Sequence, residues 1–163
     1  MRPVHIPKTS PERYISFLHA LNLRYPDEDT GDWHFMPSFF IKDGEADRSV
    51  VIAGKGCKVD TTPSLKDLGV REMSDILIDQ GVIKVKTPVY VANHYRAIAD
   101  LVMADLLSGR RPTVAGVSDI NDWLDTEEQV TTLKNEYLNL LGSQLSGQNK
   151  IIYNEWIETV GFQ

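Results

Sequence analysis

The run Asp32-Trp33-His34 is the most enzyme-like group of residues in the sequence. Histidine titrates near neutral pH, so His34 could act as a general base. Asp32 and His34 are two positions apart and would share one face of a strand. A catalytic pair also needs a third group, which the sequence does not mark. We therefore interpret Trp33 as a structural core residue and expect no catalytic site. Asp32 and His34 remain the alternative, in a small hydrolase-like or nuclease-like enzyme.

Two neighbouring motifs could also carry chemistry. Gly54-Lys55-Gly56 could hold a phosphate with its backbone amides, but it lacks the spacing and the Lys-Ser/Thr ending of a P-loop. We expect it to be a turn that ends a strand. Cys57 lies next to Lys55 and Lys58, which could lower its pKa. Without a marked partner, we expect Cys57 to be a free structural thiol.

Metal ligands are poorly represented in the sequence. The four histidines, at positions 5, 19, 34 and 94, include no pair at ligand spacing, and a single cysteine excludes the usual structural zinc sets. The acidic runs Asp27-Glu28-Asp29 and Asp119-Ile120-Asn121-Asp122 lack the glycine and the final glutamate of an EF-hand. We expect neither a metal nor another cofactor.

Residues 113–163 carry the whole excess of negative charge, with eight acidic residues against Lys134 and Lys150. One interpretation is an ordinary solvated helix surface. The other is a surface that attracts a basic partner protein, since a charged face of one sign steers opposite charge toward it. Nucleic acid is a disfavoured partner, because phosphate contacts need Lys and Arg. The predicted partner-binding residues are Asp119, Asp122, Asp125, Glu127, Glu128 and Glu136.

Arg96 and Asp100 are four positions apart in a segment with helical spacing. On an exposed helix they would form a weak ion pair. Buried against a sheet, the same pair would have a structural role, with the guanidinium held by acids or backbone carbonyls. We predict the structural role for both residues.

The segment 88–101 resembles the C-terminal part of AbiEi-type antitoxins. There, as here, a short strand enters a helix with an Arg-Ala-x-x-Asp pattern, which in this chain is Arg96-Ala97-Ile98-Ala99-Asp100. The resemblance implies binding and neutralisation of a nucleotidyltransferase-like toxin. The N-terminal part has no winged-helix pattern, so the resemblance is confined to this segment.

The elements that must position these residues follow from apolar periodicity and turn signals. We predict helices at 11–23, 70–80 and 93–107, the last capped by Asn93 and the second ended by Gly81. Strands are predicted at 33–41 and 49–53, paired as a hairpin, and at 82–86 and 89–91. A short helix or turn should begin at Thr62.

The last third is predicted to be helical throughout. Asp119 should cap a short turn, Thr126 and Gln129 form a capping box, and residues 146–149 separate a long helix from a final one. Strands followed by helices indicate an α+β fold, with helices packed on a small antiparallel sheet.

The 163 residues suit a single domain, with a mixed part at 1–112 and an acidic helical part at 113–163. No apolar run is long enough to span a membrane, and no secretory signal is visible. We expect a cytoplasmic, bacterial-type interaction protein, like an antitoxin or an immunity protein, that neutralises a basic partner protein.

Overall fold

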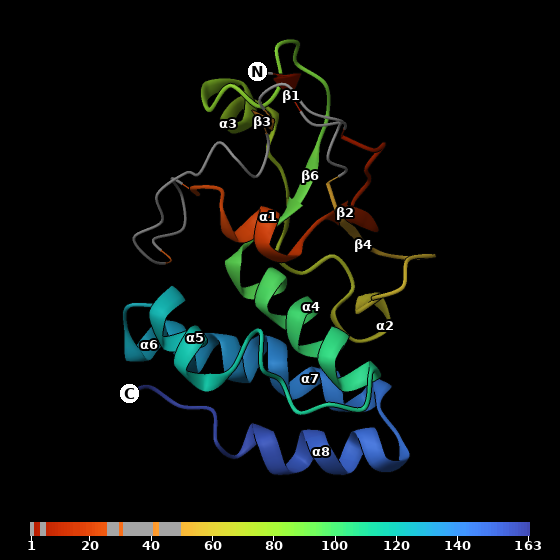
Figure 1. The fold of residues 1–163 in the computed structure, drawn as a ribbon, viewed down its shortest axis with the longest axis vertical. Coiled ribbons are helices and arrows are strands. Elements are labelled where there is room, and N and C mark those ends of the chain that lie inside the picture. Colours follow the sequence, from red (N-terminus) through yellow and green to blue (C-terminus); the bar gives the residue numbers. More distant parts are fainter. Residues whose placement is uncertain (1, 4–5, 26–29, 31–40, 43–49) are drawn as a thin grey trace.

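A four-stranded sheet forms one half of the molecule and a group of helices the other, with helix α4 (His94–Leu107) between them (Figure 1). The computed structural model describes residues 2–3, 6–25, 30, 41–42 and 50–163. Within these residues, sheet and helices combine as the α+β class requires, which confirms the predicted fold class.

The sheet is mixed. Its strand order is β4-β2-β6-β5, with β4 at Ile52–Gly54, β2 at Arg13–Ile15, β6 at Tyr90–Ala92 and β5 at Val70–Glu72. The outer pairs are antiparallel, whereas β2 and β6 are parallel, with Ile15 opposite Val91. The antiparallel sheet expected from the sequence therefore has a parallel pair at its centre.

The prediction that 33–41 and 49–53 pair as a hairpin is wrong, because the described residues of the two segments pair with other strands. Ile41 belongs to β3 (Ile41–Lys42), which pairs with β1 (Arg2–Pro3). Of the second predicted strand, Ile52 and Ala53 belong to β4, which pairs with β2 instead. The prediction that Gly54 ends this strand is confirmed, because β4 ends there and a turn follows.

The predicted helix at 11–23 is also wrong over its first half. A turn at Ser10–Arg13 leads into β2, and only Phe17–Leu21 is helical, as α1. Tyr14 and Ile15 are fully buried in the centre of the sheet. Their tertiary environment overrides a spacing that suited a helix, since local propensity is a weak determinant.

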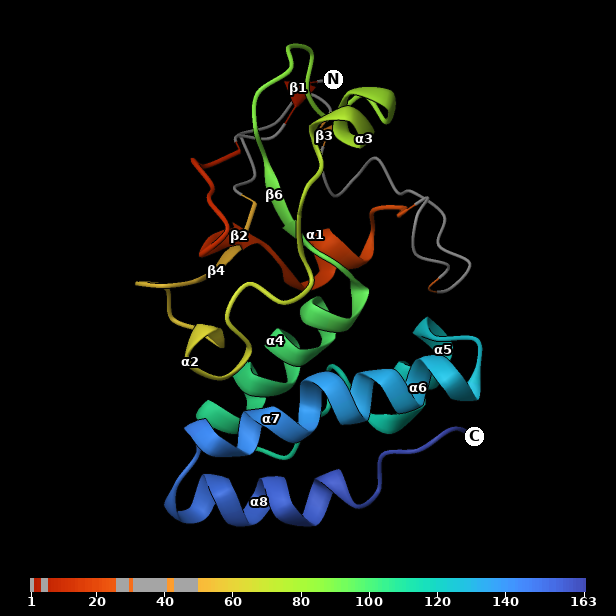
Figure 2. The same ribbon diagram turned by 180° about the vertical axis from the view of Figure 1, so that it is seen from behind.

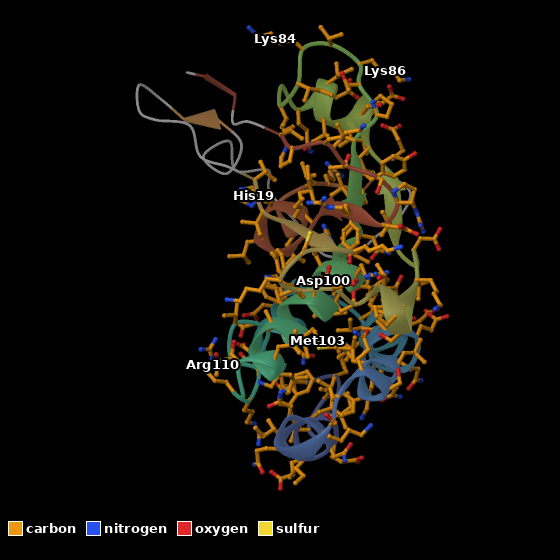
Figure 3. The ribbon with its side chains drawn as sticks, turned by 90° about the vertical axis from the view of Figure 1, so that its right-hand side faces the viewer. His19, Lys84, Lys86, Asp100, Met103 and Arg110 are labelled. Carbon is orange, nitrogen blue, oxygen red and sulfur yellow. The ribbon has the colours of Figure 1, made fainter. Side chains whose placement is uncertain are left out.

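The predicted helix at 70–80 divides into β5 and the short helix α3 (Ser74–Asp79). The residues predicted as a strand at 82–86 form none. Val82 and Ile83 instead donate their backbone N–H groups to the carbonyl of Leu77. Lys84 and Lys86 consequently lie at the end of the molecule farthest from the C-terminal helices (Figure 3).

Helix α4 confirms the helix predicted at 93–107. The Asn93 side chain accepts a 2.8 Å hydrogen bond from the backbone N–H of Arg96, which is a normal N-cap. The helix packs against α1 on the sheet side and against the C-terminal helices on the other. Its apolar residues Ile98, Met103 and Leu106 are fully buried. The predicted short helix at Thr62 is α2 (Thr62–Leu65).

The C-terminal part consists of helices, as Figure 2 shows from behind. One continuous helix begins after Thr126, the N-cap of the Thr126–Gln129 capping box, and contains α6 (Glu127–Thr132), a π-helical turn η2 (Leu133–Leu138) and α7 (Asn139–Leu141). A 3₁₀ turn η3 (Gly142–Gln144) connects it to α8 (Gly147–Ile157). Helix α5 (Val117–Trp123) begins before Asp119, so Asp119 lies in its first turn and is not its N-cap. No helix within the described ranges combines the length and the apolar character that a membrane crossing requires.

Candidate functional site

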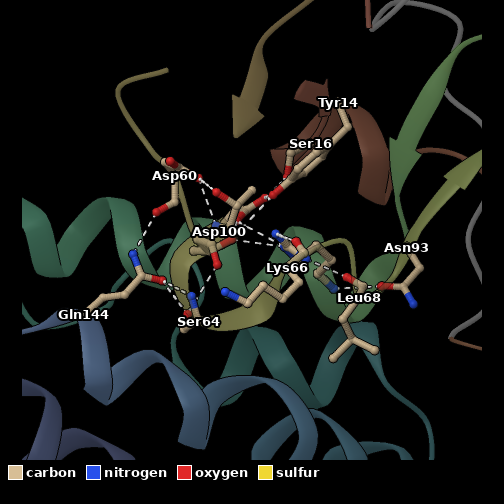
Figure 4. Close-up of polar contacts among 12 residues, drawn as sticks. Tyr14, Ser16, Asp60, Ser64, Lys66, Leu68, Asn93, Asp100 and Gln144 are labelled. Carbon is tan, nitrogen blue, oxygen red and sulfur yellow. Dashed lines mark hydrogen bonds and ion pairs between the residues drawn. The ribbon is translucent and has the colours of Figure 1, made fainter. Parts of the chain in front are cut away.

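A buried ion pair lies where helix α4 meets the sheet (Figure 4). The side chains of Arg96 and Asp100 are both fully buried, and Arg96 Nε lies 3.8 Å from Asp100 Oδ1. Helical geometry places the two residues on one face, four positions apart. An ion pair so deep in the protein needs additional hydrogen bonds to compensate for its loss of water.

Three hydroxyl groups supply those hydrogen bonds to the carboxylate. Tyr14 and Ser16 donate to Asp100 Oδ2 at 2.9 and 2.6 Å, and Thr61 donates to Oδ1 at 2.6 Å. Burial raises the pKa of Asp100, and the Arg96 charge and the hydroxyl donors oppose that rise. Burial also raises the pKa of Tyr14. Both carboxylate oxygens are therefore occupied by groups of the fold itself.

Arg96 is bound on all sides as well. Its Nε donates to Thr61 Oγ1 at 3.0 Å, and its two terminal nitrogens donate to the carbonyls of Leu68 and Lys66 at 2.7 and 2.8 Å. Its guanidinium lies 5.1 Å from the centre of the Tyr14 ring. The pair thus joins α4, β2 and the loop after α2, which is the structural arrangement that we expected for Arg96.

Two strained residues adjoin this network. Phe17 has a φ of 58° and follows Ser16, while Lys66 has a φ of 54° and offers its carbonyl to Arg96. Residues other than glycine rarely adopt such angles unless the surroundings hold them there. Ser16, which precedes Phe17, donates to Asp100, and the carbonyl of Lys66 accepts from Arg96, so the ion pair helps to hold both strained turns.

An open groove of about 530 Å³ lies between the start of α4 and the C-terminal helices. One wall carries Arg71 of β5 and Tyr95 of α4, and the other carries Glu128, Thr132 and Glu136. Sequence reasoning identified the two glutamates but missed the groove and its tyrosines, which come from distant segments.

The inner end of the groove is rigid. Asn93 Nδ2 donates to Tyr137 Oη at 3.2 Å, and the rings of Tyr137 and Tyr95 lie with their centres 5.4 Å apart. Gly69 has a φ of +78°, and a Cβ there would lie 2.6 Å from Asn93 Oδ1 and 2.9 Å from Tyr137 Oη. Glycine therefore permits the close approach that holds these side chains in place.

The predicted partner-binding residues divide into two groups. Asp122, Asp125, Glu127, Glu128 and Glu136 are exposed. Asp119 is half-buried and accepts a 3.1 Å hydrogen bond from the backbone N–H of Gly116, so it also has a structural role in α5.

The only two basic residues of 113–163 do not neutralise the acids. Lys134 donates to the carbonyl of Val160 at 3.0 Å, and Lys150 donates to that of Gly142 at 2.6 Å. Among the residues that the structure describes, none of the eight acids in this segment takes part in an ion pair. Seven of these acids are exposed, so their charge faces solvent without an ion-pair partner in the described part of the chain.

Asp32, Trp33 and His34 lie outside the described residues, so the alternative catalytic pair stays a prediction. The two described histidines, His19 and His94, are both buried, and Nε2 of His94 lies 2.8 Å from the carbonyl oxygen of Leu23. Burial lowers the pKa of His94, against the effect of its hydrogen bonds to the backbone of Leu23 and Thr30. In the described part of the chain, no three His, Cys, Asp or Glu side chains are grouped so as to hold a metal ion.

Comparison with known proteins found no matching protein family, no similar curated protein and no similar solved structure.

Proposed function

We propose that this chain is a cytoplasmic interaction module of the antitoxin or immunity type, which neutralises a basic partner protein by binding it through the exposed acids of residues 113–163. The observation that carries the proposal is that both lysines of this segment are engaged with backbone carbonyls. The exposed carboxylates are thus left to attract an external cation. Such an arrangement speeds association with a basic protein and makes the rate depend on salt.

The partner that we propose is a nucleotidyltransferase-like toxin, on the basis of the AbiEi-like segment 88–101. Within that segment, the side chains of Arg96 and Asp100 are fully buried. A fully buried pair cannot contact a partner directly, so this pair would support the fold while the acidic surface makes the contact. The proposal therefore assigns binding to the exposed acids of residues 113–163 and stability to the buried Arg96–Asp100 pair of α4.

Replacing Asp122, Asp125 and Glu127 together by serine is expected to reduce the association rate about tenfold at low salt, within the range that electrostatic steering covers. The three side chains are exposed, so stability should change little. Stopped-flow kinetics with a basic nucleotidyltransferase-like toxin as the partner, at two salt concentrations, would measure the rate and its salt dependence.

A matched control carries serine at Glu12, Asp67 and Asp79, three exposed acids of the sheet half. It removes the same charge and should bind at nearly the rate of the unmodified chain. In a bacterial host whose growth the partner inhibits, the unmodified chain should restore growth. Equal rates and equal salt dependence for both triple variants would contradict the proposal.

A further inference from the structure

We infer that the groove between Tyr95 and the α6–η2 helix binds an extended segment of basic peptide, with arginine side chains against Glu128 and Glu136. This inference rests on the proposed function, because it specifies which part of a basic partner the chain would recognise. The groove has the volume for such a segment, at about 530 Å³, and lies at the boundary between the sheet half and the helical half.

The hydrogen-bonding groups at the ends of the groove show which kind of ligand it suits. Asn93 is engaged with Tyr137, and the Gln129 side chain accepts from the backbone N–H groups of Asp125 and Thr126. Glu128 and Glu136 have no hydrogen bond or ion pair with any residue of the described ranges. What the helical wall offers a ligand is therefore chiefly negative charge and acceptor oxygens, which favours a cation.

The spacing of the carboxylates sets the form of the ligand. Glu128, Thr132 and Glu136 follow one another at four-residue intervals along a continuous helix. Glu128 lies in α6 and Glu136 in the wider, shorter-pitched π-helical turn η2, so the α-helical rise of about 1.5 Å per residue places them at most roughly 12 Å apart along the axis. In an extended peptide, residues four apart lie on the same side and are separated by roughly 13 Å. Two basic residues with three residues between them would therefore reach both carboxylates.

The opposite wall favours arginine over lysine. Tyr95 is half-buried and adds a tilted aromatic ring beside Tyr137, 31° from coplanar. A planar guanidinium stacks on such rings, whereas an ammonium is a compact, strongly hydrated charge.

The probe is the blocked pentapeptide Arg-Ala-Ala-Ala-Arg, titrated into the full chain and followed by amide NMR shifts. We expect saturable shifts at Tyr95, Thr132 and Glu136. The same peptide with citrulline in place of arginine keeps the shape without the charge and should bind at least tenfold more weakly. The lysine peptide should lie between the two.

The decisive comparison uses two double variants that remove equal charge. Glu128→Gln with Glu136→Gln alters the groove and should weaken binding of the arginine peptide at least tenfold. Glu155→Gln with Glu158→Gln alters exposed acids at and beside α8 and should change it less than twofold. Equal losses in the two double variants, or equal affinity for the citrulline peptide, would overturn the groove assignment.

The two proposals fail separately. If the groove assignment is wrong but the proposed function is right, the Asp122, Asp125 and Glu127 variant still slows partner binding while the two Gln pairs weaken the arginine peptide equally. If the proposed function is wrong and the groove assignment is right, that variant binds the partner normally while the peptide titration still depends on Glu128 and Glu136.

Discussion

Replacing Arg96 by alanine is expected to lower the free energy of unfolding by about 3–5 kcal/mol, the cost of leaving one partner of a buried ion pair uncompensated. The substitution leaves the Asp100 carboxylate fully buried without its cation. It also removes the donors from the carbonyls of Lys66 and Leu68, which hold the loop after α2. Denaturant unfolding of the variant and of the unmodified chain measures the difference.

The exposed pair Lys86–Asp75 is the control. Its atoms are closer, at 3.1 Å, but the side chains are 66% and 78% exposed. Lys86→Ala should therefore cost less than about 1 kcal/mol. A double-mutant cycle combines Arg96→Ala with Asp100→Ala and measures the interaction energy between the two residues. The double variant should lose less unfolding free energy than the two single variants lose together, because it leaves no unpaired buried charge. Additive losses below 1 kcal/mol would refute a structural role for the buried pair.

Elements whose signals are local could be predicted from the sequence. Helix α4 has its N-cap Asn93, an apolar face and the helix-ending Gly109 within one short segment. The Thr126–Gln129 capping box is likewise local and is present in the structure. Each depends on hydrogen bonds between residues three or four positions apart, so the residue types that form them can be recognised from their spacing in the sequence.

Elements defined by distant partners could not be predicted in this way. Strand β2 exists because β4 and β6 lie on either side of it, and neither is near it in the sequence. The spacing of Tyr14 and Phe17 suits a helix equally well, and only the pairing decides between the two. The parallel pairing of β2 with β6 and the pairing of β1 with β3 were inaccessible for the same reason.

The candidate site likewise combines features that a local pattern predicts with features that depend on distant segments. The four-residue spacing of Arg96 and Asp100 indicated their ion pair, and simple counting indicated the acids of 113–163. The hydroxyl donors to Asp100 come from β2, from the residue after it and from the residue before α2, and no local pattern connects those segments. Tyr95 and Tyr137 meet only because η2 packs against α4, so the groove could not be anticipated.

Gly54 and Gly56 provide a test of the sheet edge, because neither backbone angle suits a residue with a side chain and the space around the two residues differs. Both have positive φ, at 113° and 81°. A Cβ at Gly54 would lie 1.9 Å from the carbonyl oxygen of Glu12, whereas a Cβ at Gly56 would meet nothing within 4 Å. Alanine at Gly56 should therefore cost only its backbone strain, about 1–2 kcal/mol. Alanine at Gly54 adds the cost of overpacking, about 1–3 kcal/mol, to strain of similar size.

We accordingly expect Gly54→Ala to lower the free energy of unfolding by roughly 4 kcal/mol, about twice the loss or more for Gly56→Ala. The clash involves backbone on both sides, so no side-chain rotation can relieve it. The strands must move apart, which breaks the register of Arg13 with Gly54 and the 2.8 Å hydrogen bond from the N–H of Lys55 to Glu12. Chemical denaturation gives the two free energies, and hydrogen exchange at the Lys55 amide reports the local change. If both variants lose the same stability and keep the Lys55 amide equally protected, then β4 does not approach Glu12 as closely as described, and backbone angle alone explains both glycines.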